Sequence, residues 1–535
     1  MNWNPASPVF AQSRRTPDRL ALHADGTELS YAGLTDRARR LAAVLRRHGI
    51  GRGSRVGILG SRSLEAVLAV LGIAWAGAAY VPLGLKWPAW RLETALRLCP
   101  VDAVVADRGG LALLSPAVLN AIRLLLLPDD LALRSVPAEA GRLALSLADL
   151  PDAGAAAGPA PMARNDLAYV IFTSGTTGTP KGVMVPAGAV AAYLAALGQR
   201  KAMTPADRAS QFTELSFDPA LGEIFVPWHA GASLHVVPAI ARMSPARFIR
   251  ERGLTIWGSA PSAIAWMRDT RALQPGSFPG LRYSSFGGEP LPLSAVRAWQ
   301  AAAPNSAIDN LYGPTEATVD CAGQLIAPGA DPVVTPGRGI LAIGAPHPGT
   351  ELAVFGPDRR RLPPGAVGEL AIAGDQLSLG YLGAPELTAA RFPTVEGRRW
   401  YLTGDLAMQD ARGLFHHLGR IDNQVKIHGH RVELEDIEAQ LRALSGSDQV
   451  AAVAWPMEDG VARAIVGFVA QGALPPGELR EALRERLPPH MVPAEIHAIP
   501  ALPLNANGKL DRGALVARLE AGRGSGEDGD ARSSS

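Results

Sequence analysis

The chain has 535 residues, 47% of them hydrophobic, which is enough for a large core and more than one domain. Its 52 basic and 50 acidic residues leave a net charge of +2, which suggests neither a nucleic-acid partner nor an acidic tail. Two cysteines form no disulfide framework, and the N-terminus lacks the basic-then-apolar order of a signal peptide, so we expect a cytoplasmic protein.

The N-terminal part alternates short strands with helices. Residues 17–60 are expected to form two short strands and an amphipathic helix. The run 66–83 is uncharged and nearly long enough to cross a bilayer. Because Gly72, Gly77 and Pro82 interrupt it, we interpret it as a buried helix that leads into a buried strand, and we expect no membrane partner.

An apolar run at 167–171 predicts a buried strand, preceded by an Ala/Pro/Gly-rich loop at 151–164. A loop rich in hydroxyls and glycines follows. Glycines let the backbone approach a bulky anion, free N–H groups form an anion-binding concavity, and a lysine adds a mobile charge. No Gly-Lys-[Ser/Thr] stands at Walker spacing. We therefore expect a polyphosphate-binding loop rather than an ordinary Gly/Thr turn. Its residues are Thr173, Ser174, Gly175, Thr176, Thr177, Gly178 and Lys181.

This loop resembles the phosphate loop of the adenylate-forming superfamily, which includes acyl-CoA synthetases, luciferases and the adenylation domains of nonribosomal peptide synthetases. Further motifs follow in the superfamily's order between about residues 25 and 513. Alternating strands and helices predict an α/β fold with doubly wound sheets. The resemblance implies a large N-terminal core with a β-rich subdomain over 1–421 and a small mobile α+β domain over 422–513, with its hinge at Asp422. Residues 521–535 have a Gly/Ser/acidic composition, and we expect the tail over 514–535 to be largely disordered.

Three further motifs resemble the rest of the superfamily's nucleotide site: a Gly-Gly-Glu turn, the sequence from Asn310 to Thr318, and the sequence around Asp405. An aromatic ring can stack on adenine, a threonine hydroxyl can reach the α-phosphate, and a glutamate can hold Mg²⁺. A carboxylate can accept both ribose hydroxyls. The plain alternatives are a Gly-Pro turn with a solvated glutamate, and a turn aspartate at 405. The resemblance assigns ATP contacts to Gly288, Glu289, Pro290, Asn310, Tyr312, Gly313, Asp405 and Arg420, catalysis to Thr315 and Glu316, and Mg²⁺ to Glu316.

Asp218 and Pro219 can begin a helix, with Asp218 as the N-cap. In peptide-synthetase adenylation domains, the aspartate of this motif binds the α-amino group of the substrate, and acyl- or aryl-activating relatives generally lack it. The resemblance therefore favours an amino acid as substrate. It also places a set of residues around the substrate side chain: Pro219, Gly222, Gly258, Ser285, Gly287, Leu311, Val319 and Asp320. Three glycines leave room for an extended substrate side chain, and Asp320 can meet a cation. These features favour arginine, ornithine or lysine as the substrate, with serine-like substrates second. A solvated or capped Asp320 is the alternative.

The implied reaction joins the carboxylate of the amino acid to AMP and releases pyrophosphate. Lys509, on an Asn-Gly turn, would bridge the reacting oxygens. The small domain would then rotate about Asp422, bring the strand at Lys426 to the site and admit a phosphopantetheine thiol. No carrier-domain or condensation-domain motif occurs in the 535 residues, so we expect a free-standing ligase of natural-product biosynthesis that loads a separate carrier protein. An acyl- or aryl-CoA ligase and an inactive homologue are the alternatives.

Overall fold

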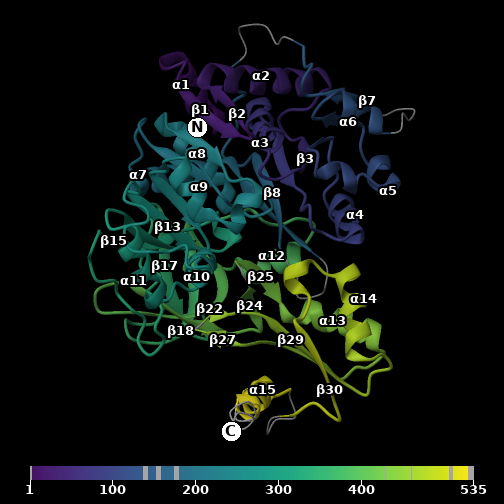
Figure 1. Cartoon of the computed structure of the whole chain (residues 1–535), viewed down its shortest axis with the longest axis vertical. Helices are drawn as coiled ribbons and strands as arrows, with labels where there is room; N and C mark the ends of the chain where they lie inside the picture. The colour runs from purple at the N-terminus through teal and green to yellow at the C-terminus, as the bar shows by residue number, and fades with distance from the viewer. Residues whose placement is uncertain are drawn as a thin grey trace, which may run out of the picture. The chain divides into compact units, whose positions relative to one another are not determined.

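The computed structural model describes residues 3–136, 143–151, 158–173, 180–427, 429–458, 461–504 and 510–527 (Figure 1). The chain divides into two compact units, which meet in the sequence between Ile421 and Asp422. The first unit contains two large sheets with helices and a smaller β-rich part, and the second contains a three-stranded sheet with helices. The mixed α/β class predicted from the sequence is confirmed.

The first large sheet has eight strands in the order β19-β9-β8-β4-β3-β5-β6-β7. Its strands from β8 to β7 are parallel, and β9 and β19 extend it antiparallel. Thr173 at the end of β8 pairs with Lys181 at the start of β9, so the two ends of the phosphate loop lie side by side. The strands are β3 (Arg55–Leu59), β4 (Ala79–Pro82), β5 (Ala103–Ala106), β6 (Leu124–Leu127), β7 (Leu143–Ser146), β8 (Leu167–Thr173), β9 (Lys181–Pro186) and β19 (Gly380–Tyr381).

The second large sheet has nine strands in the order β16-β15-β14-β13-β12-β10-β11-β1-β2. The strands from β14 to β1 are parallel, so β12, β13 and β14 end at the same edge of the sheet. The strands are β1 (Leu20–Ala24), β2 (Thr27–Ser30), β10 (Arg208–Gln211), β11 (Ser233–Val236), β12 (Ile256–Ser259), β13 (Tyr283–Gly287), β14 (Ala307–Tyr312), β15 (Ala322–Ile326) and β16 (Ala345–Pro346).

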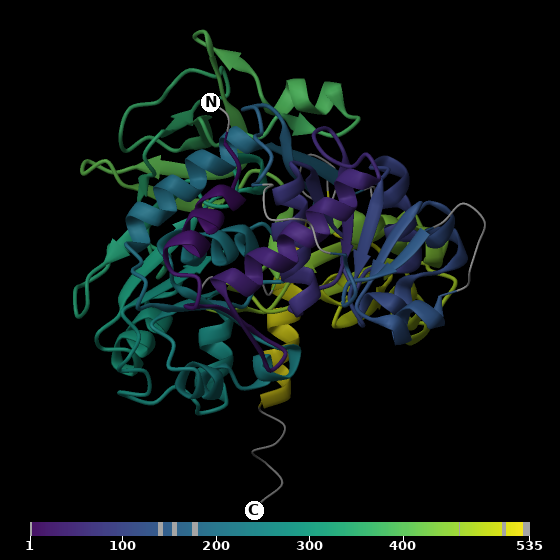
Figure 2. The same cartoon turned by 90° about the horizontal axis from the view of Figure 1, so that it is seen from above.

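Helices cover both sheets. Helices α2 and α3 pack side by side among the purple N-terminal elements (Figure 2). A Cβ on Gly72 of α3 would lie 2.6 Å from Leu41 Cδ2 of α2, so this close packing requires glycine. The helix and strand predicted over 66–83 are confirmed as α3 and β4. The helices of this unit are α1 (Ala6–Arg15), α2 (Tyr31–Arg47), α3 (Leu64–Ala76), α4 (Ala89–Leu98), α5 (Pro116–Asn120), α6 (Asp130–Ser135), α7 (Ala187–Lys201), α8 (Pro219–Ala230), α9 (Pro245–Glu251), α10 (Ser262–Asp269), α11 (Leu293–Ala302) and α12 (Pro385–Arg391), with short 3-10 turns η1 (Gly110–Leu113), η2 (Ala239–Met243) and η3 (Thr315–Ala317).

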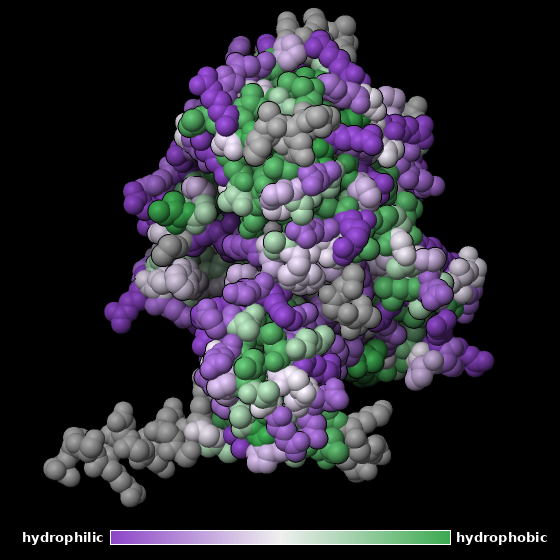
Figure 3. Space-filling model, turned by 90° about the vertical axis from the view of Figure 1, so that its right-hand side faces the viewer, coloured by the Kyte–Doolittle hydropathy of each residue, from purple (hydrophilic) through white to green (hydrophobic). Residues whose placement is uncertain are grey.

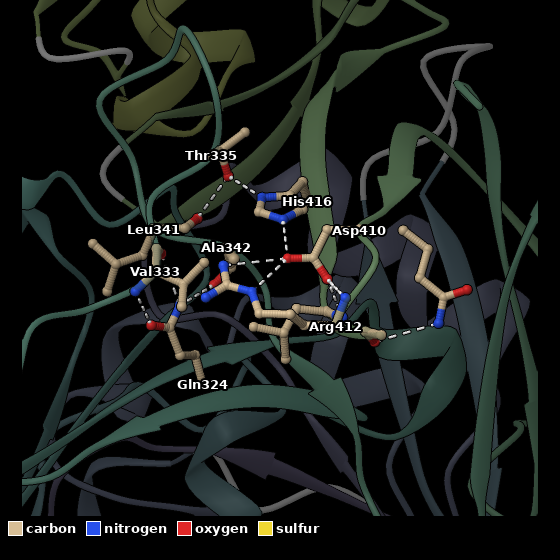
Figure 4. A network of polar contacts seen from close by, with 11 residues as sticks. Gln324, Val333, Thr335, Leu341, Ala342, Asp410, Arg412 and His416 are labelled. Atoms are coloured by element: carbon tan, nitrogen blue, oxygen red, sulfur yellow. Dashed lines mark hydrogen bonds and ion pairs between the residues drawn. The ribbon is translucent and has the colours of Figure 1, made fainter. Parts of the chain in front are cut away.

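The β-rich part of the first unit is an antiparallel sheet in the order β17-β18-β22-β23. A buried histidine, His416, connects it to the loop between β15 and β16 of the second large sheet (Figure 4). Its ring nitrogens lie 3.3 Å from Asp410 Oδ2 and 3.3 Å from Thr335 Oγ1. Gln324 of β15 donates to the Ala342 carbonyl at 3.1 Å and so fixes the far end of the same loop. The strands are β17 (Thr350–Phe355), β18 (Gly368–Gly374), β20 (Thr394–Val395), β21 (Arg398–Arg399), β22 (Tyr401–Gln409) and β23 (Phe415–Arg420).

In the second unit, strand β26 separates two small cores. Val450 and Ala452 belong to the core with α13 and α14, whereas Ala451 and Val453 face α15, as alternation along a strand requires. Figure 1 shows α15 on the other side of the sheet from α13 and α14. The elements are β24 (Gln424–Ile427), β25 (His430–Glu433), α13 (Leu434–Ser445), β26 (Val450–Ala454), β27 (Met457–Glu458), β28 (Val461–Ala462), β29 (Ile465–Ala470), α14 (Pro476–Arg486), η4 (Pro489–Met491), β30 (Glu495–Ile499) and α15 (Arg512–Glu527).

The tail prediction needs a correction. Residues 514–527 continue helix α15, where we predicted disorder over 514–535. Leu515 and Leu519 are 1% and 8% exposed, and their spacing of four residues gives the helix an apolar side that packs on the sheet. The composition argument covered only residues 521–535, which follow this pair. Residues 528–535 lie outside the described part of the chain.

Figure 3 shows hydrophobic residues as well as polar and charged ones on one face. The exposed large hydrophobic side chains include Leu131, Ile240 and Leu504, from separate parts of the sequence. Single exposed hydrophobic residues are normal for a folded domain. Within the described ranges, no helix combines the length and the apolar character that crossing a bilayer demands.

Candidate active site

Asp218 precedes helix α8 with a helical backbone, and its side chain caps nothing, so the N-cap interpretation is wrong for this side chain. Its Oδ2 atom is buried and has no hydrogen-bond partner among the described residues. Burial raises the pKa of Asp218 to about 6; hydrogen bonds from Thr315 and the Val319 backbone oppose the rise, and the charge of Glu316 adds to it. A buried carboxylate oxygen without a partner is costly and suits a cationic ligand. Pro219, next to it, is exposed.

The turn after β14 holds the backbone of Val319 in an unusual conformation. Thr318 and Val319 have φ angles of 56° and 73°, which β-branched residues rarely adopt. Gly313 permits this fold of the chain, since a Cβ there would lie 2.5 Å from Asp320 Cα. Gln376, which sequence reasoning missed, donates to the Asp320 carbonyl at 2.8 Å and accepts from the Thr318 hydroxyl at 2.6 Å through its backbone carbonyl. The surrounding contacts thus hold a strained turn beside Asp218.

The predicted pocket residues Gly258 and Ser285 lie side by side. They are register partners in β12 and β13, and a Cβ on Gly258 would lie 3.3 Å from Ser285 Oγ and 3.5 Å from Glu223 Oε1. Gly287 is the register partner of Leu311 in β14, and a Cβ there would lie 3.1 Å from the Leu311 carbonyl oxygen. The structure therefore brings these four predicted residues to one region, together with Glu223.

The space beside Gly222 is already filled, which corrects the prediction that this glycine leaves room for a substrate. A Cβ there would lie 2.8 Å from Leu197 Cδ2 and still closer to the Tyr193 hydroxyl. Tyr193 donates to Asp320 Oδ2 at 3.2 Å. Gly222 admits this tyrosine, which the local sequence did not single out.

Asp320 is 6% exposed, so the alternative that it is solvated is wrong. Tyr193 caps one of its carboxylate oxygens, whereas Oδ1 has no hydrogen-bond partner among the described residues. The ring nitrogen His347 Nδ1 lies 3.5 Å from Oδ1, but burial lowers the pKa of His347 to about 4, so this imidazole is neutral. Burial raises the pKa of Asp320 to about 7, and the charge of Lys201 is the strongest influence that lowers it.

The predicted ribose ligand Asp405 lies within strand β22, so the turn-aspartate alternative is wrong. Its Oδ1 atom accepts from Arg420 Nη1 at 2.7 Å, and its Oδ2 atom accepts from the Tyr312 hydroxyl. His417 Nε2 lies 3.4 Å from Oδ1. Two predicted nucleotide residues, Tyr312 and Arg420, thus bind the carboxylate of a third, Asp405. Ribose hydroxyls would have to share it with Tyr312 or displace that hydroxyl.

Two further predicted nucleotide residues, Glu289 and Asn310, each hold a loop in place. Glu289 Oε2 accepts from the Ser262 backbone N–H at 2.8 Å, at the start of α10, and Gly288 beside it has a φ of 84°. Asn310 Nδ2 donates to the Ala342 carbonyl at 2.9 Å, the same oxygen that Gln324 contacts. Pro290 follows in the same turn, between β13 and α11.

Glu316 is 1% exposed in the short helix η3, next to Thr315, so the solvated-glutamate alternative is wrong. Its Oε1 atom accepts from the Tyr381 hydroxyl at 2.7 Å. A buried carboxylate suits Mg²⁺, which commonly takes one or two carboxylates and fills its remaining positions with water and phosphate oxygens.

Tyr381→Phe should raise the Mg²⁺ concentration for half-maximal ATP–pyrophosphate exchange by about tenfold, because groups that orient a metal ligand typically contribute that much. The measurement is a Mg²⁺ titration at saturating ATP. Tyr31→Phe is the matched control, since Tyr31 is also buried but donates to the Ala232 backbone carbonyl. An unchanged Mg²⁺ midpoint in Tyr381→Phe would show that Tyr381 does not orient Glu316.

The remaining predicted residues lie outside the described part of the chain, beside the phosphate loop, or in the second unit. Ser174, Gly175, Thr176, Thr177, Gly178 and Lys509 lie outside the described residues. Thr173 and Lys181 flank the phosphate loop, and Lys181 is half-buried. In the second unit, Lys426 lies in β24 and Asp422 Oδ1 accepts from the Gln424 backbone N–H at 3.2 Å.

Comparison with known proteins identifies the family. The sequence model described as AMP-binding enzyme matches residues 9–382, and the model of the AMP-binding enzyme C-terminal domain matches residues 436–509. The chain belongs to the AMP-binding enzyme family. Within the adenylate-forming superfamily, it is an adenylation domain of the nonribosomal peptide synthetase type.

Two solved structures and one curated relative illustrate this. The chain is similar to the Vibrio cholerae adenylation domain AlmE in complex with glycyl-adenosine-5'-phosphate, with a TM-score of 0.86, 30% identity and coverage of 97% of this chain and 98% of AlmE. It also resembles holo-PA1221, a nonribosomal peptide synthetase protein that contains adenylation and PCP domains (TM-score 0.79, 26% identity, 97% and 84% coverage). The probable non-canonical nonribosomal peptide synthetase CymA of Salinispora arenicola is 36% identical over 522 residues, 94% of this chain. The chain spans only 6% of the length of CymA.

Proposed function

We propose that this adenylation domain activates an α-amino acid with ATP to aminoacyl-AMP, releases pyrophosphate, and transfers the aminoacyl group to the phosphopantetheine thiol of a separate carrier protein. The observation that carries this proposal is the buried, unpartnered Oδ2 atom of Asp218. An α-ammonium group supplies the missing partner, whereas a simple acyl or aryl acid does not. A carrier protein as acceptor agrees with the PCP domain that PA1221 contains beside its adenylation domain.

We infer further that the substrate side chain carries a positive charge, as in arginine, ornithine or lysine. Asp320 Oδ1 is buried without a hydrogen-bond partner among the described residues and offers a second place for a cation. The narrowing at Gly222 by Tyr193 favours a slender side chain such as that of ornithine. We place the reaction in the cytoplasm, where ATP is available; the buried free thiols of Cys99 and Cys321 agree with a reducing compartment.

The adenylation step requires positioning and charge stabilisation more than a protein nucleophile. Asp218 would bind the ammonium group and orient the carboxylate of the amino acid toward the α-phosphorus. Thr315 would donate to the α-phosphate, Lys181 and the phosphate loop would bind the remaining phosphates, and Lys509 would bridge the reacting oxygens. Mg²⁺ held by Glu316 would stabilise the charge of the departing pyrophosphate.

ATP–pyrophosphate exchange across a panel of amino acids tests the proposal. We expect exchange with cationic amino acids and none with their deaminated analogues. Transfer is then tested with a phosphopantetheinylated carrier protein and with free CoA as alternative acceptors. Activation of acids that lack the amine, with transfer to free CoA, would instead establish an acyl- or aryl-CoA ligase.

Asp422→Pro should leave pyrophosphate exchange within about twofold of wild type and abolish thioester formation. Proline fixes φ near −65° and would block a rotation at this residue. The division of the chain between Ile421 and Asp422 supports the choice of position. Asp422→Ala, which keeps the backbone free to rotate, is the control. Equal losses in both half-reactions would contradict a hinge at Asp422.

A further inference from the structure

The structure places a histidine directly beside the carboxylate of Asp320. His347 follows strand β16, and its backbone N–H donates to the Cys321 carbonyl at 2.8 Å, so it lies next to the start of β15. Its side chain is 0% exposed, and its Nδ1 atom lies 3.5 Å from Asp320 Oδ1. His347 belongs to no motif recognised in the sequence. The contact with Asp320 nevertheless brings it to the predicted pocket for the substrate side chain.

His347 and Asp320 both have buried polar atoms without a partner. Neither ring nitrogen of His347 has a hydrogen-bond partner among the described residues, and Asp320 Oδ1 has none either. Two other oxygen atoms of Asp320 are occupied: Oδ2 accepts from the Tyr193 hydroxyl at 3.2 Å, and the backbone carbonyl accepts from Gln376 Nε2 at 2.8 Å. Buried polar atoms are nearly always paired, because an unpaired one keeps the full cost of leaving water. Two such atoms 3.5 Å apart therefore lack a shared partner.

The chemistry of these two atoms defines the partner that they lack. Burial lowers the pKa of His347 to about 4, although the Asp320 backbone acts in the opposite direction, so the imidazole is neutral near pH 7. A neutral imidazole has a proton on one nitrogen and a lone pair on the other. We assign the lone pair to Nδ1, because no hydrogen bond joins this atom to Oδ1. The two facing atoms are then both acceptors, and a group with several N–H donors can bond to both.

Another buried histidine beside an aspartate shows the arrangement of a purely structural contact. His416 is 2% exposed. Its two ring nitrogens lie 3.3 Å from Asp410 Oδ2 and 3.3 Å from Thr335 Oγ1, so both have partners within the protein (Figure 4). His347 is buried as deeply and has neither contact. The difference indicates that the polar atoms of His347 serve a ligand rather than the fold.

We propose that His347 is a specificity-determining residue of the side-chain pocket: Asp320 Oδ1 and His347 Nδ1 together bind one terminal ammonium group of the substrate side chain. This inference rests on the proposed function and narrows its substrate class. The carboxylate supplies the opposite charge, and the imidazole adds a second acceptor. A primary ammonium group, as in ornithine or lysine, has three N–H donors and so satisfies both atoms.

The test compares the KM for ornithine with the KM for norvaline, an uncharged amino acid with the same carbon skeleton, in pyrophosphate exchange. His347→Leu should raise the ornithine KM about tenfold or more, because a hydrogen bond to a charged group contributes about that factor. The norvaline KM should stay within about twofold of wild type. In Asp320→Asn the ammonium group is no longer held, so adding His347→Leu should change neither KM further. Unchanged KM values in His347→Leu, or an equal rise in both, overturn the proposal.

Two conservative variants identify the nitrogen that takes part. The side-chain oxygen of asparagine can take the position of Nδ1, whereas the side-chain oxygen of glutamine reaches the position of Nε2. His347→Asn should therefore restore most of the preference for ornithine that His347→Leu loses, and His347→Gln should restore little of it. The reverse order would overturn the proposal, which requires Nδ1.

A second measurement is independent of catalysis. His347→Leu removes two unpaired polar atoms, so the Tm of the substrate-free protein should stay the same or rise. His416→Leu is the matched control, because it breaks two existing contacts: it should lower Tm and leave the ratio of the two KM values unchanged. A fall in Tm in His347→Leu as large as in His416→Leu would show that the ring is bonded without substrate, and would overturn the proposal.

The Tm shift caused by ligand separates this inference from the proposed function. Without ATP, ornithine should raise the Tm of wild type more than norvaline does, and this difference should disappear in His347→Leu. That pattern together with no pyrophosphate exchange for any amino acid would support the role of His347 and overturn the proposed function. A lower KM for norvaline than for ornithine in wild type would leave amino-acid activation in place and overturn the inference.

Discussion

Asp218→Asn is expected to lower kcat/KM for amino-acid activation by at least about a hundredfold, mostly through KM, because removal of one partner from a buried ion pair typically costs about 3–5 kcal/mol. The free protein already holds Oδ2 of Asp218 buried and unpaired among the described residues. The substrate ammonium group would complete that pair. Asparagine keeps the size of the side chain and one acceptor but removes the charge. ATP–pyrophosphate exchange as a function of amino-acid concentration measures the effect.

Measuring the Tm of Asp218→Asn distinguishes a loss of substrate binding from damage to the fold. The pKa of Asp218 is raised to about 6, above that of an unfolded aspartate, so ionisation of this group destabilises the folded protein as pH rises through that range. Asp218→Asn should therefore raise Tm at pH 8 and raise it less at pH 4. The KM for ATP should stay within about threefold of wild type, because the adenine and ribose contacts are assigned elsewhere. Retention of full activity with the amino acid would disprove the role of Asp218.

Local patterns in the sequence were sufficient for the buried strand that leads to the phosphate loop and for the helix and strand over 66–83. An apolar run needs only its own residues to indicate burial. The hydrogen-bond partner of a polar side chain, by contrast, could not be predicted from local patterns. Tyr381 reaches Glu316 across 65 positions, and Gln376 reaches Asp320 across 56. Both contacts depend on chain crossings that no local spacing encodes.

The predicted pocket for the substrate side chain likewise could not be derived fully from the sequence. Glycine at position 222 leaves room for a neighbouring group, but the sequence does not say whether substrate or protein fills that room. In the structure Tyr193 fills it, from a helix that precedes α8.

Lys509→Ala is expected to lower the rate of pyrophosphate exchange by about a hundredfold or more, comparable to the loss of one preorganised donor in an oxyanion site. Lys509 lies outside the described residues, and its role is a proposal from the Asn-Gly turn at the end of the C-terminal motif. The KM for the amino acid should change little, since Asp218 and Asp320 would carry its binding. The loss should therefore appear in kcat.

The half-reactions distinguish this role from a general defect. A rotation of the second unit would withdraw Lys509 before the thiol attacks, so chemically supplied aminoacyl-AMP should still load the carrier protein at near the wild-type rate in Lys509→Ala. Lys509→Arg keeps the charge but replaces a compact ammonium group with a planar fork, and should recover only part of the exchange activity. Near-full exchange in Lys509→Ala would mean that charge stabilisation at the α-phosphate comes from the phosphate loop and Mg²⁺ alone. In that case the need for two compact units would lie wholly in the second half-reaction, and Asp422→Pro would remain the variant that reveals it.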